Sequence, residues 1–430
     1  MTACAIEPSA ESGNDGAPRP GCGITAEGAY AARLARHGDS WYPERWTLDG
    51  PEPYAVPLPG NQPEEPGTEV QPMADGRVLV HRVAAGRHLF SLLYPTGPGT
   101  GELPLGAVEC PPDTTGVRLL PPVPGGERAY ALAVGPRATV LWQVAGAAFG
   151  PERLAEIPGR CSGGVWLDGA GRMLALDRET GGRVKAVAVD LERDGEVSPL
   201  LQIAPDSDDR ILLADPDSGL VLVRSDAPSP GRERLGWGVL GSALPVRFPE
   251  CLHLPDCVVT PFAIQPGQAL TPERCAVALR VDGPFGSWVG VWRPAERRVR
   301  HLPAPEGWLA GAGLWTPDGE LRLPCSTPQL PCGVARLAPG GGGEAASGGV
   351  GEAAPGGVGE AAAGGVGEAA AGGSGERLDD GTQDGPGDRR GDRPEGRPEG
   401  DKPEERGEGT PPPPRPVPLQ QAPLGRRVTK

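Results

Sequence analysis

The sequence is poor in lysine, in aromatic side chains and in long apolar runs. It has three lysines against 38 arginines, and Phe, Trp and Tyr together make up 4% of its 430 residues. The excess of Arg, Ala, Gly and Pro over Lys is typical of a GC-rich genome, and we expect a bacterial source. No stretch reaches the ~20 apolar residues that span a bilayer, and no basic and then apolar leader opens the chain, so we expect a cytoplasmic protein.

Clustered positive charge is also missing. The net charge is −15, and no run of five basic residues occurs in the chain. Nucleic acids and anionic membranes bind clustered Lys and Arg side chains. The charge therefore predicts neither a nucleic-acid partner nor a membrane partner.

The cysteines do not form a recognisable disulfide framework. There are nine, an odd number, and their spacing is irregular. In a reducing cytoplasm such residues are mostly small buried side chains with free thiols. The positions are Cys4, Cys22, Cys110, Cys161, Cys251, Cys257, Cys275, Cys325 and Cys332.

Residues 68–338 consist of short apolar runs separated by Gly, Pro and Asp. The runs are rich in Val and Leu and too short for helices, which favours strands. No amphipathic helix lies between them, so consecutive strands should pair antiparallel. Examples are Arg77–His81, Leu89–Tyr94, Ala129–Val134, Leu220–Val223 and Trp288–Trp292.

Asp-Gly turns and a long period indicate how these strands are grouped. Asp75, Asp168 and Asp318 are each followed by glycine, a strong hairpin signal. Repeating units start at intervals of roughly 44–51 residues, close to the ~40–50-residue period of propeller blades. We therefore predict an all-β fold: a six- or seven-bladed β-propeller of four-stranded antiparallel blades over residues 41–339. The units begin near Thr68, Thr114, Gly163, Ser207, Cys257 and Trp308.

The two ends of this region suggest how the ring closes. Tyr54–Leu58 and Gly333–Leu337 are both short strand-like runs. A seventh blade that combines them would pair N- and C-terminal strands and protect their edges.

The segments outside the propeller are predicted to lack a core. Residues 1–40 are expected to be largely disordered, apart from a short helical turn capped by Thr25. Residues 340–375 repeat an octad of Gly-Gly-Val-Gly-Glu-Ala-Ala and one variable residue, and residues 376–430 are charged and Pro-rich. Such compositions cannot offset their ordering entropy, so we predict a flexible linker and then a disordered C-terminal tail. Within the tail, Pro411–Pro418 could dock in an aromatic groove as polyproline II.

One segment resembles a known family. The run Leu314–Leu323, Leu-Trp-Thr-Pro-Asp-Gly-Glu-Leu-Arg-Leu, resembles the Pro-Asp-Gly signature of TolB-type propellers and of the N-terminal propellers of prolyl-oligopeptidase-type serine peptidases. The blades are WD40-like in architecture only, because the Trp-Asp dipeptide of WD40 repeats is absent. Peptidases of this type need a further hydrolase domain with a nucleophile in G-x-S-x-G, and the sequence contains no such motif.

Two motifs could begin a chemical site, and a structural role explains each better. Gly97–Glu102 resembles a phosphate-binding loop, but its last residue replaces the required lysine and no helix follows, so we interpret it as a hairpin. Cys251, His253 and Cys257 could bind zinc together with Cys275. Their spacing matches no common zinc arrangement, so we interpret this segment as a connection between blades.

Acidic residues and a cysteine pair give weaker signals. Asp215 and Asp217 resemble part of a calcium loop, but the downstream bidentate glutamate is missing, so we interpret them as a turn. The acidic segment Asp206–Asp217 is singled out for ligand binding without being assigned as a site. Cys325 and Cys332 could pair across a loop or remain free.

These observations predict a binding function without chemistry. No catalytic residue, cofactor-binding residue or metal ligand is assigned, and no cofactor is expected. We predict a monomeric, non-catalytic binding or scaffold propeller that takes a protein or small ligand at the mouth of its central channel. The alternatives are the substrate-gating propeller of a serine peptidase without its catalytic domain and, less favoured, a glycosidase or lyase with scattered carboxylates. Five tryptophans could line the binding surface or pack between blades: Trp237, Trp288, Trp292, Trp308 and Trp315.

Overall fold

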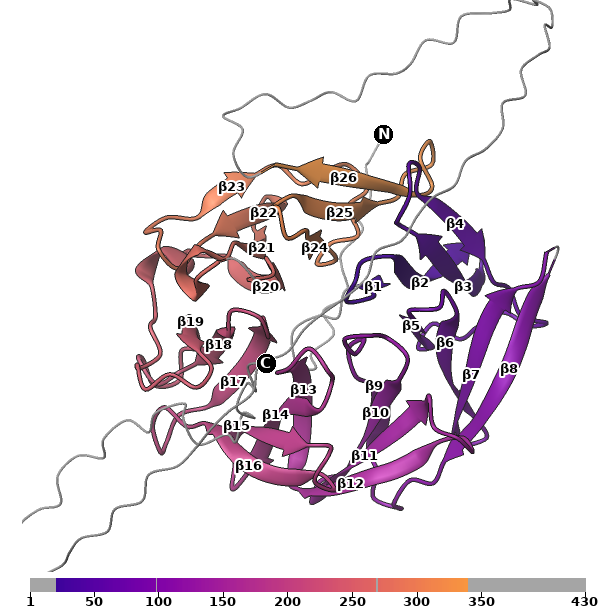
Figure 1. Cartoon of the computed structure of the whole chain (residues 1–430), viewed down its shortest axis with the longest axis horizontal. Coiled ribbons are helices and arrows are strands. Elements are labelled where there is room, and N and C mark those ends of the chain that lie inside the picture. The colour runs from indigo at the N-terminus through magenta and orange to yellow at the C-terminus, as the bar shows by residue number, and fades with distance from the viewer. Residues whose placement is uncertain (1–20, 98, 268–269, 339–430) are drawn as a thin grey trace, which may run out of the picture. The chain divides into compact units, whose positions relative to one another are not determined.

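The computed structural model describes residues 21–338, except residues 98, 268 and 269. In this part of the chain, seven antiparallel sheets surround one axis as the blades of a β-propeller (Figure 1). The strands of each blade follow one another in the sequence, and the first strand of each blade is innermost. The predicted all-β propeller is confirmed, and of the two predicted blade numbers the structure has seven.

Five blades have four strands and two have three, counted over the described residues. No helix in this range is long and apolar enough to cross a membrane. Blades one to three contain β1 (Gly23–Ile24), β2 (Tyr30–His37), β3 (Ser40–Thr47) and β4 (Tyr54–Pro57); β5 (Glu69–Pro72), β6 (Val78–Ala84), β7 (Arg87–Pro95) and β8 (Thr100–Val108); and β9 (Gly116–Leu119), β10 (Ala129–Val134), β11 (Ala138–Ala145) and β12 (Glu152–Pro158).

The remaining blades include the two with three strands, which are blades five and seven. Two short 3-10 turns, η1 (Glu250–Leu252) and η2 (Pro272–Arg274), precede and follow the first strand of blade six. Blades four to seven contain β13 (Arg160–Trp166), β14 (Met173–Thr180), β15 (Arg183–Asp190) and β16 (Glu196–Leu201); β17 (Asp209–Ala214), β18 (Leu220–Ser225) and β19 (Arg234–Val239); β20 (Val258–Ile264), β21 (Val277–Gly283), β22 (Gly286–Trp292) and β23 (Arg300–Leu302); and β24 (Leu314–Trp315), β25 (Leu321–Cys325) and β26 (Gly333–Leu337).

Adjacent blades pack face to face, so the central strands of a blade are buried on both sides. All six residues of β10 are buried. Leu132 of this strand belongs to a hydrophobic cluster with Leu174 of blade four. Its neighbour Ala131 belongs to a cluster with Leu79 of blade two. Successive side chains of a strand point to opposite faces, which explains why these strands are continuous apolar runs in the sequence.

The ring closes without a shared strand, contrary to the predicted seventh blade. β4 pairs with β3 in blade one, and β26 pairs with β25 in blade seven, so Tyr54–Leu58 and Gly333–Leu337 do not meet in one sheet. The prediction was wrong because residues 23–47 already supply three strands, which β4 completes as blade one. Side chains join the two blades instead, in a buried cluster that includes Trp46 and Cys332.

Blade one begins before the expected start of the propeller at residue 41. β1 and β2 lie within the segment 1–40, and β2 is an eight-residue strand where a helical turn after Thr25 was expected. β2 pairs with β3 through a two-residue turn of Gly38 and Asp39. Gly38 has a left-handed φ of 58°, which tight hairpin turns of this kind require.

The other predictions for the chain ends lie outside the described residues. They concern residues 1–20, the octad linker at 340–375 and the charged tail at 376–430. The polyproline run Pro411–Pro418 belongs to the same tail.

Candidate functional site

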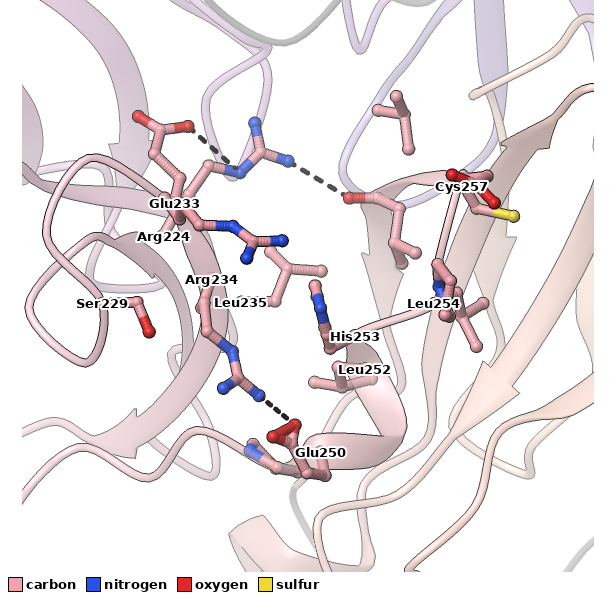
Figure 2. A pocket seen from close by; sticks show the side chains of 16 residues that line it. Arg224, Ser229, Glu233, Arg234, Leu235, Glu250, Leu252, His253, Leu254 and Cys257 are labelled. Carbon is pink, nitrogen blue, oxygen red and sulfur yellow. Dashed lines mark hydrogen bonds and ion pairs between the residues drawn. The ribbon is translucent and has the colours of Figure 1, made fainter.

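A pocket of about 810 Å³ lies between blades five and six (Figure 2). Its walls come from the end of β18, the turn from β18 to β19, the beginning of β19, the connection from β19 to β20 and the first residues of β20. Charged, polar and apolar side chains all contribute to the lining. The residues labelled in Figure 2 are Arg224, Ser229, Glu233, Arg234, Leu235, Glu250, Leu252, His253, Leu254 and Cys257.

The pocket exists because blade five has no complete fourth strand. After β19 the chain makes a single antiparallel bridge, in which the backbones of Trp237 and Arg247 exchange two hydrogen bonds of 2.9 Å. It then forms η1, which buried Leu252 anchors, and crosses to β20. A 3-10 turn thus occupies the edge where five of the other blades carry a fourth, outer strand, and this leaves space between blades five and six.

Arg224 connects the two blades across the pocket. Its Nη2 donates a hydrogen bond of 3.1 Å to the carbonyl of Val259 in blade six, and its Nε lies 4.0 Å from a carboxylate oxygen of Glu233 (Figure 2). Burial lowers the pKa of Arg224, and the charge of Glu233 opposes this shift. A guanidinium does not deprotonate in proteins, so this wall of the pocket is positively charged.

A second ion pair lines the pocket beside η1. Nη2 of Arg234 lies 2.5 Å from Oε2 of Glu250, and this hydrogen bond lowers the pKa of Glu250. The Glu250 side chain is 77% exposed, whereas that of Arg234 is 17% exposed. The carboxylate partner of this ion pair is open to solvent, which weakens the pair. A ligand carboxylate can therefore replace Glu250 on a guanidinium that the blade already holds in place.

The four residues considered for zinc do not converge. His253 and Cys257 line the pocket, but Cys275 is fully buried in blade six, where its thiol donates a hydrogen bond to the Thr271 carbonyl. Among the described residues, no group of three or more His, Cys, Asp and Glu side chains could hold a metal ion. The segment from Cys251 to Cys257 is the predicted connection between two blades.

An apolar hollow of about 520 Å³ adjoins the pocket. The two share the lining residues Leu254, Pro255 and Cys257. Trp288 also lines the hollow, and its indole N–H donates a hydrogen bond of 2.7 Å to Nδ1 of His301. All five tryptophans singled out in the sequence pack in or against the clusters between blades, but the other four line neither the pocket nor the hollow. One tryptophan of the five is thus placed to contact a ligand.

The acidic segment Asp206–Asp217 forms an inter-blade contact and a turn. The fully buried Asp209 makes an ion pair with Lys185 of blade four. Asp215 accepts a hydrogen bond from the backbone N–H of Ser218, which closes the turn before β18. The predicted turn at Asp215 is confirmed, and the segment does not line the pocket.

The remaining motifs also have structural roles. Gly97–Glu102 belongs to the β7–β8 hairpin, as predicted, and Glu102 makes an ion pair of 2.6 Å with Arg82. Cys325 and Cys332 are both free thiols, like the other described cysteines.

The described residues of the pocket do not pair a nucleophile with a base. No hydrogen bond within the described residues joins Ser229 or Cys257 to His253 or to a carboxylate, as a nucleophile and base would require. Arg224 and Arg234 carry no recognisable motif in the sequence. The long connection between β19 and β20 is the signal that could have located them, because it leaves no apolar run for an outer strand.

No family model and no curated protein matches this sequence. Solved structures of similar fold include TolB from Acinetobacter baumannii, at 11% identity over 73% of this chain and 78% of that chain, with a TM-score of 0.39. Prolyl oligopeptidase B from Galerina marginata matches at 11% identity over 70% of this chain and 45% of that chain, with a TM-score of 0.45. Oligogalacturonate lyase from Vibrio parahaemolyticus matches at 10% identity over 73% of this chain and 87% of that chain, with a TM-score of 0.45. The propeller fold that the Pro-Asp-Gly resemblance implied is confirmed by the seven blades of the structure.

Proposed function

We propose that the chain is a monomeric, non-catalytic binding propeller whose ligand enters the pocket between blades five and six. The ligand is a short peptide segment or a small molecule with a charged group beside an apolar one. The observation that carries this proposal is the polar pocket, which contains two arginines and opens beside an apolar hollow. The proposed site lies between two blades, whereas the sequence suggested the mouth of the channel.

The size and lining of the pocket support this ligand class. Pockets of ~300–1,000 Å³ are typical of small-molecule sites. Arg224 and Arg234 present guanidinium groups, which bind carboxylates through paired hydrogen bonds. Glu233 and Glu250 present carboxylates that accept hydrogen bonds from an ammonium group. An aliphatic or aromatic side chain of the same ligand fits the hollow beside Trp288.

A library of displayed short peptides, captured on the immobilised propeller, tests the proposal. We expect the enriched peptides to carry a carboxylate close to an aliphatic or aromatic side chain. In calorimetry, Arg234→Gln should weaken their binding ~10-fold, which corresponds to about 1.4 kcal/mol. Trp288→Ala should weaken the same peptides, and the exposed Arg193→Gln on blade four serves as the control. Equal binding to all variants would place the site elsewhere, and a library without enrichment would exclude a peptide ligand.

A second candidate function is the substrate gate of a serine peptidase whose catalytic domain comes from another polypeptide. One observation favours it: blades one and seven share no strand, so the ring can part there without breaking a sheet. This function requires the chain alone to be inactive on a prolyl p-nitroanilide and to change the peptide-length preference of a hydrolase added in trans. An unchanged preference would argue against it.

A further inference from the structure

The innermost strand of blade four is approached by an arginine from each neighbouring blade. Nη2 of Arg118, on β9 of blade three, donates a hydrogen bond of 3.1 Å to the carbonyl of Gly163. Nη1 of Arg210, on β17 of blade five, donates a hydrogen bond of 3.3 Å to Oγ of Ser162. Two guanidinium groups separated by 92 positions in the sequence thus converge on two consecutive residues of β13.

A bulge in β13 exposes this point of the strand. Ser162 pairs with Asp177 of β14 and Val165 pairs with Ala175, so the pairing slips between them. Gly163 has a left-handed φ of 74°, and a Cβ at this position would lie 2.9 Å from Oδ2 of Asp177. A side chain larger than hydrogen would therefore collide with the carboxyl group. Glycine leaves the backbone of the bulge open to the two arginines.

The carboxyl group beneath the bulge changes its charge near neutral pH. Oδ1 of Asp177 accepts a hydrogen bond of 3.0 Å from the backbone N–H of Ile211. Burial raises the pKa of Asp177 to about 7, and the charge of Glu233 adds to this rise. The charges of Arg210 and Arg118 oppose it.

The other groups at this point do not change charge in the same pH range. Burial raises the pKa of the neighbouring Cys161 thiol to about 11, so it remains neutral. Both guanidinium groups remain charged at any physiological pH. At about pH 6 and below, the cluster therefore holds two positive charges over a largely protonated carboxyl group.

Arg210 keeps hydrogen-bond donors for a ligand. Its nitrogens lie 3.9 Å from Asp177 and 3.8 Å from Glu233, beyond hydrogen-bond distance, and its side chain is 29% exposed. Ser162 accepts from Arg210, so the hydroxyl proton of Ser162 is available to donate. The cluster can thus offer hydrogen bonds from Arg210 and from the Ser162 hydroxyl group, beside the positive charge of Arg118.

We propose that Arg118, Arg210 and the hydroxyl group of Ser162 form a binding site for an oxyanion: a carboxylate, sulfate or phosphate group of a ligand. Guanidinium groups bind such anions through short, charge-assisted hydrogen bonds. The site lies on the innermost strands, apart from the pocket between blades five and six, and does not depend on the function proposed for that pocket.

Equilibrium dialysis of the full chain against labelled sulfate, at constant ionic strength, tests this site. Sulfate keeps its charge between pH 6 and pH 8.5, so any change in affinity reports the protein. We expect saturable binding that weakens about 5–10-fold as Asp177 ionises over this range. Arg118→Gln and Arg210→Gln should each weaken binding at pH 6 at least 10-fold. Asp177→Asn should retain the pH 6 affinity at pH 8.5.

Matched variants and a second anion complete the test. Arg193→Gln, exposed on the same blade, and Arg234→Gln, in the pocket, should bind sulfate like the natural chain. If succinate displaces sulfate, the natural ligand carries a carboxylate. If succinate does not displace sulfate, the site prefers a tetrahedral oxyanion. The site is excluded if the natural chain shows no saturable binding, or if folded Arg118→Gln and Arg210→Gln variants bind sulfate as tightly as it does.

Discussion

Nζ of Lys185 lies 2.7 Å from Oδ2 of Asp209, and this ion pair joins a central strand of blade four to the first strand of blade five. Asp209 is fully buried, and the hydroxyl groups of Ser207 and Ser225 donate further hydrogen bonds to its carboxylate. Lys185 is the one lysine within the described residues. The chain thus places a lysine where a buried carboxylate needs a positive partner.

We expect Lys185→Met to lower the free energy of unfolding by ~3 kcal/mol, because loss of one partner leaves the other charge buried without compensation. Urea unfolding followed by circular dichroism measures this change. Arg153→Gln is the control, since Arg153 and Glu156 form an ion pair in which both side chains are 54% exposed. That substitution should cost less than ~1 kcal/mol. Equal effects of the two substitutions would show that the buried pair does not stabilise the fold.

Asp177 should make the stability of the propeller depend on pH. Burial raises its pKa from 3.8 to about 7, so the native state binds this proton more tightly than the unfolded state. The free energy of unfolding should therefore fall as the pH rises through this interval. Asp177→Asn removes the charge and keeps an oxygen for the N–H of Ile211. We expect this variant to be more stable than the natural chain by ~2–4 kcal/mol at pH 8.5 and nearly equal to it at pH 4.

Unfolding midpoints measured from pH 4 to pH 8.5 provide the check on Asp177. At each pH, the unfolding midpoint of the natural chain is subtracted from that of Asp177→Asn. This difference isolates Asp177, because all other groups titrate in both proteins. A difference that stays constant across this range would show that Asp177 is ionised in the folded state throughout.

The buried thiols should resist alkylation in the folded protein. Burial raises the pKa of Cys22 to about 12 and that of Cys332 to about 11, and only thiolates react readily. Treatment with iodoacetamide at pH 8 and peptide mapping by mass spectrometry measure each site separately. We expect Cys22, Cys161 and Cys332 to react at least 100-fold more slowly in the native state than in urea. Fast native labelling of Cys22 and Cys332 would mean that blades one and seven separate in solution.

Local sequence signals predicted the propeller better than they predicted its closure or its sites. The buried strands, such as Ala129–Val134, are continuous apolar runs because both faces contact other blades. Tyr30–His37 lacks such a run, and its pairing depends on the turn at Gly38, so β2 was missed. Arg118 and Arg210 meet at Ser162 and Gly163 only through the packing of three blades. No spacing along the chain reports such a contact.

The contact between blades one and seven should be sensitive to a single methyl group at Gly28. This residue has a left-handed φ of 77°, and a Cβ added to it would clash with Cδ2 of Leu314 in blade seven. Gly38, in the β2–β3 turn, has a φ of 58° and no atom within 4 Å of such a Cβ. Gly38→Ala therefore measures the backbone strain alone, ~1–2 kcal/mol.

Gly28→Ala should cost about 1 kcal/mol more than Gly38→Ala, because the methyl group also displaces Leu314 from its packed position. This additional destabilisation by Gly28→Ala should speed amide hydrogen exchange in β1 and β24, measured by mass spectrometry, and leave exchange in β10 unchanged. The cluster around Trp46 joins the two blades without a shared strand. Because no strand pairing holds the two blades together there, a local loss of packing should loosen the contact between them. Equal costs for the two variants, with equal exchange in β24, would mean that the contact between blade one and blade seven does not depend on close packing at Gly28.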